Sequence, residues 1–546
     1  MTKKITNNII HAFFPIFYEI DQKIFDKDSK VHQISDTILN KKITDDFLKK
    51  YCPDIEYIKL KEIPSLWKKS QPGEWQDFYS NIRQILGVSS KPTICLSFEL
   101  ADKTLLLLSQ LKGGKPRLFF INLNSGAKQR SGIDSIYFQI NNANLYLFRT
   151  GVAILDISWH YCSYKKYDPN TKEAKDLKAT NDAKKEIEDN NHTKNKYNAE
   201  DLKIEDGDIF INAILEGNYF LSHNNENIPN NHKKNDNIKT DSAVLTADKD
   251  FIKDLSKCLI PDIGINRYEL DSHRTIIYTL TNIQDDKTLD DKLLISARLS
   301  RRWTSDYAPN IEIIHKNYFL PFPYIMHMPS LEGGATTVYI NNDTPEVVKN
   351  FINNQANNTY IPIYIAALHS HFWLLNKTQL IPTIQFDKDS KEEKKYFSNL
   401  LESIIEFKRF FHNILISQIS MHNDFYNLLQ KKLKINERLN TLEDITSKNT
   451  QIISERRIRW IAPISGAIGG MILTKEILDI IAKNGIFLKK PTLKSIFVDI
   501  KYHNLNEVKS LIQLSHNWDI IIFIGSIIGG VLGLVLAWYF DAKIKK

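Results

Sequence analysis

Three arginines and a tryptophan near the end of a predicted helix form the cluster best suited to bind an anion. Arg298, Arg301, Arg302 and Trp303 lie within six residues of one another. Arginine guanidinium groups bind phosphate oxygens with paired hydrogen bonds, and an indole ring can stack on a nucleotide base. The same charges would also stabilise a helix C-terminus on a solvated face. The spacing therefore indicates either an anionic ligand site or a helix-terminus charge cluster.

No other part of the sequence carries a recognisable catalytic or metal-binding motif. His369 and His371 flank Ser370, but residues two apart on a helix face different directions, so they are not a metal pair. HExxH, Walker, GxSxG and strand-following GxGxxG motifs are all missing from the sequence. The four cysteines are far apart and predict buried thiols in a reducing compartment. We expect no catalytic residue, no bound metal and no cofactor.

Length and composition are those of an ordinary folded chain. The 546 residues carry 72 basic and 64 acidic side chains, which gives a net charge of +8, and 42% of the residues are hydrophobic. These values exclude a wholly disordered, collagen-like or disulfide-scaffold protein. Basic and acidic residues are interleaved along the chain, so nucleic-acid binding is not supported.

The chain up to residue 385 has the pattern of an α/β protein with a mixed or antiparallel sheet. Apolar runs separated by Gly, Pro and Asn predict cytoplasmic α/β regions at 1–164 and 207–385. A polar insertion at 165–206 and a polar linker at 222–240 have too few large aliphatic residues to fold by themselves. Strands are predicted at 9–17, 93–100, 105–111, 118–123, 136–140, 145–148, 152–159, 275–280, 311–314 and 336–340, and helices at 286–302 and 363–375.

A single long stalk helix is predicted over residues 386–459. No Gly or Pro occurs between Pro382 and Pro463, and apolar residues recur there at helical spacing. About 69 helical residues would extend roughly 100 Å. Such a helix needs a coiled coil, a bundle or a stalk.

Two uncharged runs near the C-terminus predict transmembrane helices at 460–475 and 519–540. Trp460–Thr474 contains 15 uncharged residues and Ile520–Phe540 contains 21, against about 20 for a bilayer. Basic residues flank both runs, which places both chain ends in the cytoplasm and the loop 476–518 outside. We therefore expect a multi-pass inner-membrane protein with a basic tail at 541–546 and the lipid bilayer as a partner.

Small residues spaced by four in both runs predict close helix packing, within one chain or around a pore. The expected helix-packing residues are Gly525, Gly529 and Gly533, the pore-lining candidates are Pro463, Ser465, Gly466, Gly469, Gly470, Met471 and Thr474, and the basic pore mouth is Arg456, Arg457 and Arg459.

This order of parts resembles the CorA family of divalent-cation channels. The segments NLYLFRTGVAILDI (144–157) and YIPIYIAALH (360–369) look like those of divergent CorA-like proteins. The resemblance implies a homo-oligomer, typically a pentamer, whose stalk helices lead to a pore. The family's Gly-Met-Asn motif is missing, because Gly470-Met471 is followed by Ile472. This departure puts magnesium selectivity in doubt.

The sequence leaves three functions open. The first is a CorA-like channel or effector whose cytoplasmic domain senses a ligand. By resemblance to the type III CRISPR branch of these proteins, that ligand is a nucleotide second messenger, an S-adenosylmethionine–AMP conjugate. The second function is a constitutive divalent-cation transporter, and the third is a membrane-anchored scaffold or enzyme.

Overall fold

The computed structural model describes most of the chain up to residue 452. The described residues are 4–18, 35–52, 65–70, 78–79, 83, 85–86, 94–110, 116–123, 125–166, 207–222, 244–246, 251–260, 267–268, 275–284, 288–302, 310–380, 391–412 and 415–452, with single positions at 472, 476, 524, 527, 528, 531 and 535. Contacts divide the chain into one unit of residues 1–383 with 403–442 and a second unit of 384–402 with 443–546.

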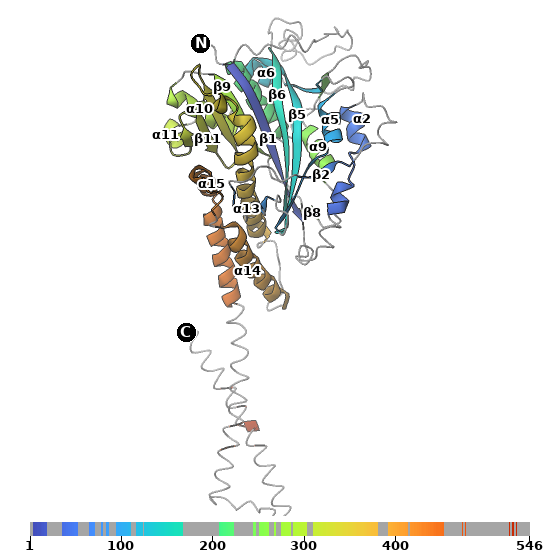
Figure 1. The fold of residues 1–546 in the computed structure, drawn as a ribbon. Helices are drawn as coiled ribbons and strands as arrows, with labels where there is room; N and C mark the ends of the chain where they lie inside the picture. The colour runs from blue at the N-terminus through green and yellow to red at the C-terminus, as the bar shows by residue number, and fades with distance from the viewer. Residues whose placement is uncertain are drawn as a thin grey trace, which may run out of the picture. The chain divides into compact units, whose positions relative to one another are not determined.

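The first unit is built on one large mixed sheet (Figure 1). The described strands run in the order β10-β11-β12-β9-β1-β6-β5-β3-β2; in addition, β4 pairs with β5, β7 pairs with β4, and β8 pairs with β1. Neighbours are antiparallel except for β9 with β12 and β4 with β7, which are parallel. The strands are β1 (Lys4–Tyr18), β2 (Trp67–Lys69), β3 (Cys95–Leu100), β4 (Leu118–Asn122), β5 (Ile133–Phe148), β6 (Val152–Lys166), β7 (Val244–Thr246), β8 (Arg267–Tyr268), β9 (Ile276–Gln284), β10 (Phe319–Phe322), β11 (Ile325–Pro329) and β12 (Gly333–Ile340).

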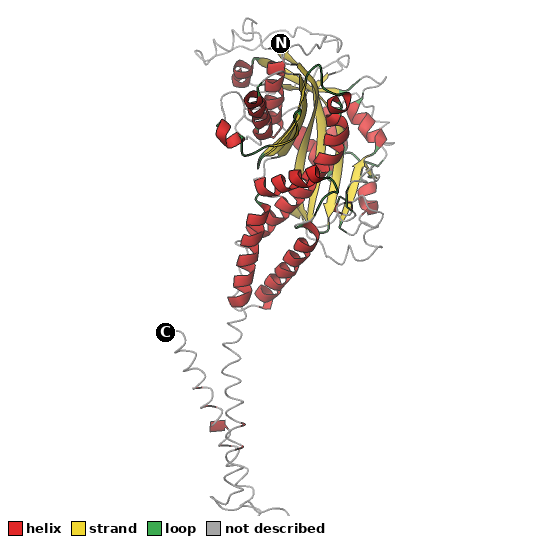
Figure 2. Ribbon diagram, turned by 60° about the vertical axis from the view of Figure 1, so that its left-hand side comes forward, coloured by secondary structure: helices red, strands yellow, loops and turns green. Residues whose placement is uncertain are grey.

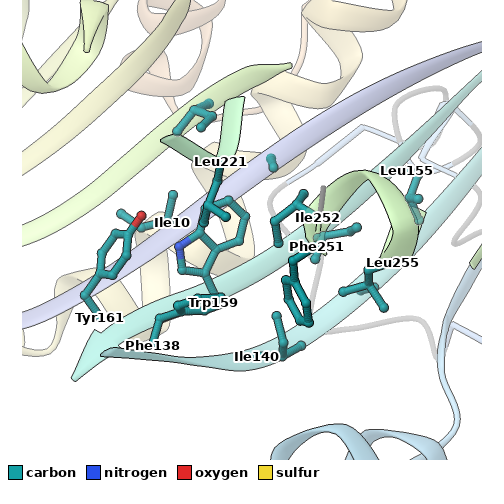
Figure 3. Packing of buried hydrophobic residues seen from close by; sticks show 14 of the residues in the cluster. Ile10, Phe138, Ile140, Leu155, Trp159, Tyr161, Leu221, Phe251, Ile252 and Leu255 are labelled. Carbon is teal, nitrogen blue, oxygen red and sulfur yellow. The ribbon is translucent and has the colours of Figure 1, made fainter. Parts of the chain in front are cut away.

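Helices cover both faces of the sheet (Figure 2). Because side chains alternate along a strand, β6 sends Leu155 and Trp159 to one face and Asp156 to the other. On the first face, Phe138 and Trp159 pack with Phe251 of α9 in the main core (Figure 3). The helices of the first unit that lie outside α13–α15 are α2 (Asp45–Tyr51), α5 (Asp102–Ser109), α6 (Ser125–Ser131), α8 (Gly207–Ser222), α9 (Phe251–Leu259), α10 (Leu289–Arg301), α11 (Ile311–Ile314), α12 (Glu346–Lys349) and the π-helix η3 (Ile352–Tyr360).

The opposite face is covered by helix α13 (Ile361–Leu380). All residues of α13 from 361 to 374 are buried, which suits a helix that is apolar on every side. It continues directly from η3, whose wider turns precede Pro362. Proline removes a backbone donor and crowds the preceding turn of an α-helix, and the π-helical segment accommodates this.

Two predicted strands are helices in the structure. Residues 105–111 were expected to be a strand, but Asp102–Ser109 forms α5, which buries only Thr104 and Leu108. Residues 311–314 form α11, because the Asn310 side chain accepts a hydrogen bond from the Glu312 backbone N–H. Short apolar runs do not distinguish a helix from a strand by periodicity.

The continuous stalk helix predicted over 386–459 is wrong. The described chain there forms α14 (Lys391–Phe411), α15 (Ser420–Lys432) and a further helix from 435 to 452. Between α14 and α15, the Asn423 side chain accepts from the backbone N–H groups of Ile416 and Ser417. These tertiary and capping contacts interrupt a helix that contains neither Gly nor Pro.

The predicted membrane part is also corrected. Among the described residues, none of the helices has the length and apolar character needed to cross a bilayer. The last turns of α13, for example, contain Asn376, Lys377, Thr378 and Gln379. This finding contradicts the expected pair of transmembrane helices, the multi-pass inner-membrane localisation and the ion-channel assignment built on them. The segments 460–475 and 519–540 enter the described residues only at single positions.

Candidate functional site

The candidate site is centred on α13, whose two histidines contact different parts of the first unit. Residues two apart on a helix point in different directions, and His369 and His371 do so here. Both are buried. The signal for burial was present, because the run from Ile361 to Leu374 is apolar all round.

His369 connects α13 to the turn between β5 and β6 and to α14. Its ring stacks on Phe148 at 4.0 Å between centroids and contacts Phe411 at 4.3 Å. Its Nε2 atom lies 2.7 Å from the Thr150 hydroxyl oxygen. Burial lowers the pKa of His369 to about 3, so the ring is neutral near pH 7 and joins the elements without a charge.

A small cavity lies beside this contact. It encloses about 60 Å³ and is lined by Ile94, Arg149, Thr150, Glu406, Phe410 and Phe411. Arg149 Nε lies 3.3 Å from Glu406 Oε1, which ties the β5–β6 turn to α14 by an ion pair. The lining is mostly apolar, and the space is too small for a nucleotide.

The β5–β6 turn is fixed from the other side by Tyr18 of β1. The Tyr18 hydroxyl donates to the Phe148 carbonyl at 2.5 Å, and the Tyr18 backbone N–H donates to the Gly151 carbonyl at 3.0 Å. Gly151 has φ +88°, and a Cβ atom there would lie 2.8 Å from the Tyr18 carbonyl oxygen. The turn therefore needs glycine at this position.

His371 connects α13 to the break that follows α15. Its Nδ1 atom lies 3.3 Å from the Leu433 carbonyl oxygen and 3.3 Å from Arg438 Nη1. Nδ1 must carry a proton to donate to Leu433 but must lack one to accept from Arg438. The two contacts therefore require different protonation states of Nδ1 in the His371 ring. At the break itself, Lys434 has a left-handed backbone with φ +53°.

A second pair of histidines, His327 of β11 and His422 of α15, lies between α15 and the sheet. His327 of β11 bonds the Thr336 hydroxyl at 2.8 Å, stacks on Tyr360 at 4.3 Å and contacts Phe425 of α15 at 4.9 Å. Burial, with a smaller contribution from His422, lowers the pKa of His327 to about 3. Neutral histidine is therefore part of the packing between β11, η3 and α15.

The sheet carries one buried acid–histidine pair that the sequence did not reveal. His11 Nδ1 lies 3.0 Å from Asp156 Oδ1, and both side chains are buried. The two residues lie on β1 and β6 and are 145 positions apart in the sequence, so no local spacing could have indicated the pair. His11 shares the sheet face of Phe13, which contacts Tyr364 of α13 at 5.4 Å.

The predicted arginine cluster does not converge on one point. Arg298 donates to the Asn212 side chain of α8 at 2.9 Å. Arg302 is buried at the C-cap of α10, with φ +57°, and donates to the carbonyls of Thr275 and Glu332. Arg301 occupies the last turn of α10, and Trp303 lies outside the described residues.

The remaining predicted site residues also lie outside the described residues. They are the pore-lining candidates Pro463, Ser465, Gly466, Gly469, Gly470, Met471 and Thr474, the basic residues Arg456, Arg457 and Arg459, and the packing glycines Gly525, Gly529 and Gly533.

No protein-family model, curated protein or solved structure matches this chain. The function is therefore argued from geometry. Within the described part of the chain, no group of three or more His, Cys, Asp or Glu residues is placed to hold a metal ion. The site around α13 connects the sheet to α14 and to the break after α15.

Proposed function

We propose that this protein is a ligand-responsive effector in which the sheet domain senses a small ligand and α13 passes the response to neighbouring helices. The observation that carries the proposal is the pair of histidines on α13. His369 contacts the β5–β6 turn and α14, while His371 contacts the break after α15. One buried helix thus touches the sheet and both helical segments that follow it.

A response of this kind requires two arrangements that bind the ligand differently. A ligand shifts an equilibrium only by its difference in affinity for the two states, and typical coupling free energies are about 1–3 kcal/mol. A neutral hydrogen bond contributes about 1 kcal/mol. Breaking or exchanging the contacts of His369 and His371 therefore involves energies of the required size.

The resemblance to CorA-like proteins supports the same order of events, from a sensing domain to following helices. The nucleotide second messenger and the pentameric assembly that the resemblance implies stay predictions.

Replacing Thr150 by valine tests transmission through α13. Thr150→Val removes the hydroxyl bonded to His369 and keeps the shape of the side chain, so we expect faster amide hydrogen exchange at residues 433–442 as well as at the turn. Loss of a bond of about 1 kcal/mol corresponds to roughly a fivefold change in local opening. Exchange is measured peptide by peptide on the full chain by mass spectrometry.

The matched control is Thr104→Val. Thr104 is buried in α5, and its hydroxyl donates to the Ser65 carbonyl at 3.4 Å. The control should leave residues 433–442 unchanged. If Thr150→Val alters only the turn, the proposal of transmission through α13 fails.

A further inference from the structure

The helix that leads into α13 begins with a segment of wider turns. Phe351, before η3, and Ile361, after it, both have right-handed helical backbone angles, so η3 and α13 form one continuous helix. The backbone N–H of Asn354 donates to the carbonyl of Asn350, four residues back, whereas that of Ile361 donates to the carbonyl of Ala356, five residues back. Each π-helical turn therefore holds about one residue more than an α-helical turn, and segments of this kind are rare outside functional sites.

Pro362, the second residue of α13, favours this wider pattern. In an α-helix its ring would crowd the carbonyl of Asn358, four residues back, and the proline offers that carbonyl no N–H. In the π-helical pattern the carbonyl opposite position 362 belongs to Asn357 instead. The α-helical alternative needs only an exchange of hydrogen bonds among the same residues, because η3 is helical in both patterns. Pro362 therefore holds η3 in one of two related arrangements.

Within the part of the chain that the structure describes, no side-chain hydrogen bond fixes the rotation of the first half of α13. The Tyr364 hydroxyl is buried and has no hydrogen-bond partner there, and the other buried side chains from 361 to 368 are apolar. One residue of register would turn α13 by about 100° and move it about 1.5 Å along its axis. Apolar side chains would face the sheet before and after this movement, whereas both histidines of α13 would leave their partners together.

The start of η3 is tied to two strands of the sheet. Asn7 of β1 donates through its side-chain amide to Asn353 Oδ1 at 2.9 Å. The side-chain amide of Asn282 in β9 donates to the carbonyl of Lys349, just before η3, at 2.8 Å. A ligand that shifts β1 or β9 would therefore act directly on η3.

We propose that η3 is a register switch, in which exchange between its π-helical and α-helical forms moves α13 by about one residue and breaks both histidine contacts at once. The inference rests on the proposed function and supplies the two arrangements that it requires. The π-helical form keeps His369 on Thr150 and His371 on Leu433. A ligand that binds better to the α-helical form would loosen the β5–β6 turn, α14 and the break after α15 together.

Replacing Pro362 by alanine tests the switch in the full chain. Pro362→Ala restores an N–H and removes the ring, so it should favour the α-helical form of η3. We expect amide hydrogen exchange to become roughly fivefold faster at Phe148–Gly151 and at residues 433–438, the effect of losing one neutral hydrogen bond at each place. Exchange is measured peptide by peptide by mass spectrometry.

A second variant and a matched control accompany this substitution. Asn354→Ala combined with Asn358→Ala changes only exposed side chains and raises the α-helix propensity of η3, so it should give the same pattern with a smaller amplitude. Pro345→Ala makes the same replacement at an exposed proline, the N-cap of α12, which has no preceding helical turn to crowd. This control should match the wild type.

A double-mutant cycle separates a switch from a general loss of stability. Thr150 contacts His369, which lies about 10 Å further along α13 than Pro362, so independent effects of the two substitutions would multiply. If the switch is correct, Pro362→Ala already breaks the contact of Thr150. Adding Thr150→Val to Pro362→Ala should then change exchange at the turn less than about twofold, rather than roughly fivefold.

Three results would overturn the switch: effects of Pro362→Ala and Thr150→Val that simply multiply, a change confined to residues 352–361, or unchanged exchange at the turn and at 433–438 in both η3 variants. The proposed function fails in a different way. Thr150→Val would then leave residues 433–442 unchanged, while Pro362→Ala would still change both places and support the switch.

Discussion

At the scale of single residues, the described region depends on histidines that are buried without charge. His327 is stacked on Tyr360, and His369 lies between Phe148 and Phe411. The sequence contains both histidines but gives no indication of these partners. Phe148 and Phe411 are far from residue 369 along the chain, and only the packing of α13 on the sheet brings them together.

This burial predicts that the protein loses stability as the pH falls below neutral. In the folded state the pKa values of His327 and His369 are about 3, against 6.5 for an exposed histidine. The unfolded chain therefore takes up protons below pH 6.5 that the folded chain does not bind, and stability is lost from pH 6.5 down towards pH 3. At pH 5 each histidine should lower the free energy of unfolding by about 2 kcal/mol, since one pKa unit corresponds to about 1.4 kcal/mol.

The measurement is the thermal unfolding midpoint at pH 7.5 and pH 5 for the wild type and His369→Phe. Phenylalanine keeps the ring contacts but cannot titrate, so the variant should lose less stability on acidification. His315→Gln, which changes an exposed histidine beside Asp290, should behave like the wild type. An unchanged pH dependence in His369→Phe would contradict the assignment.

At the scale of elements, the sequence predicts the strands that alternate or lie in long apolar runs, and it fails where tertiary contacts interrupt a favourable helix. The expected strands at 9–17, 152–159 and 336–340 lie within β1, β6 and β12. The break after α15 has no local signal, because lysine at 434 favours a right-handed helix. The side chains of His371 and Arg438 meet at that break, and their contact requires α13 to be in place.

The left-handed backbone of Lys434 predicts that glycine is preferred there. Lys434→Gly removes the steric cost of φ +53°, so it should stabilise residues 433–438 by about 1 kcal/mol. In an uninterrupted helix the same change would instead destabilise by about 1 kcal/mol. Amide hydrogen exchange at residues 433–438 shows whether Lys434→Gly stabilises or destabilises this segment, and we expect slower exchange in the variant. Faster exchange would show that the break is not the preferred conformation.

At the scale of the whole molecule, pairing between distant segments could not be predicted from the sequence. β1 pairs with β6 on one side and with β9 on the other, so His11 lies opposite both Ser158 and Tyr278. Hydrophobic patterning indicates which segments are strands, but not their order across a sheet. For the same reason the sequence grouped Arg298 with Arg302, whose partners in the structure are Asn212 and Thr275.

The central claim is that α13 couples the β5–β6 turn to α14 and to the break after α15. The most direct test is amide hydrogen exchange of the full chain for the wild type and for His371→Phe, which removes the contact with the Leu433 carbonyl. The account predicts faster exchange at residues 431–438 together with a change at Phe148–Gly151 and at 403–411. A change confined to 431–438, or no change at all, would contradict it.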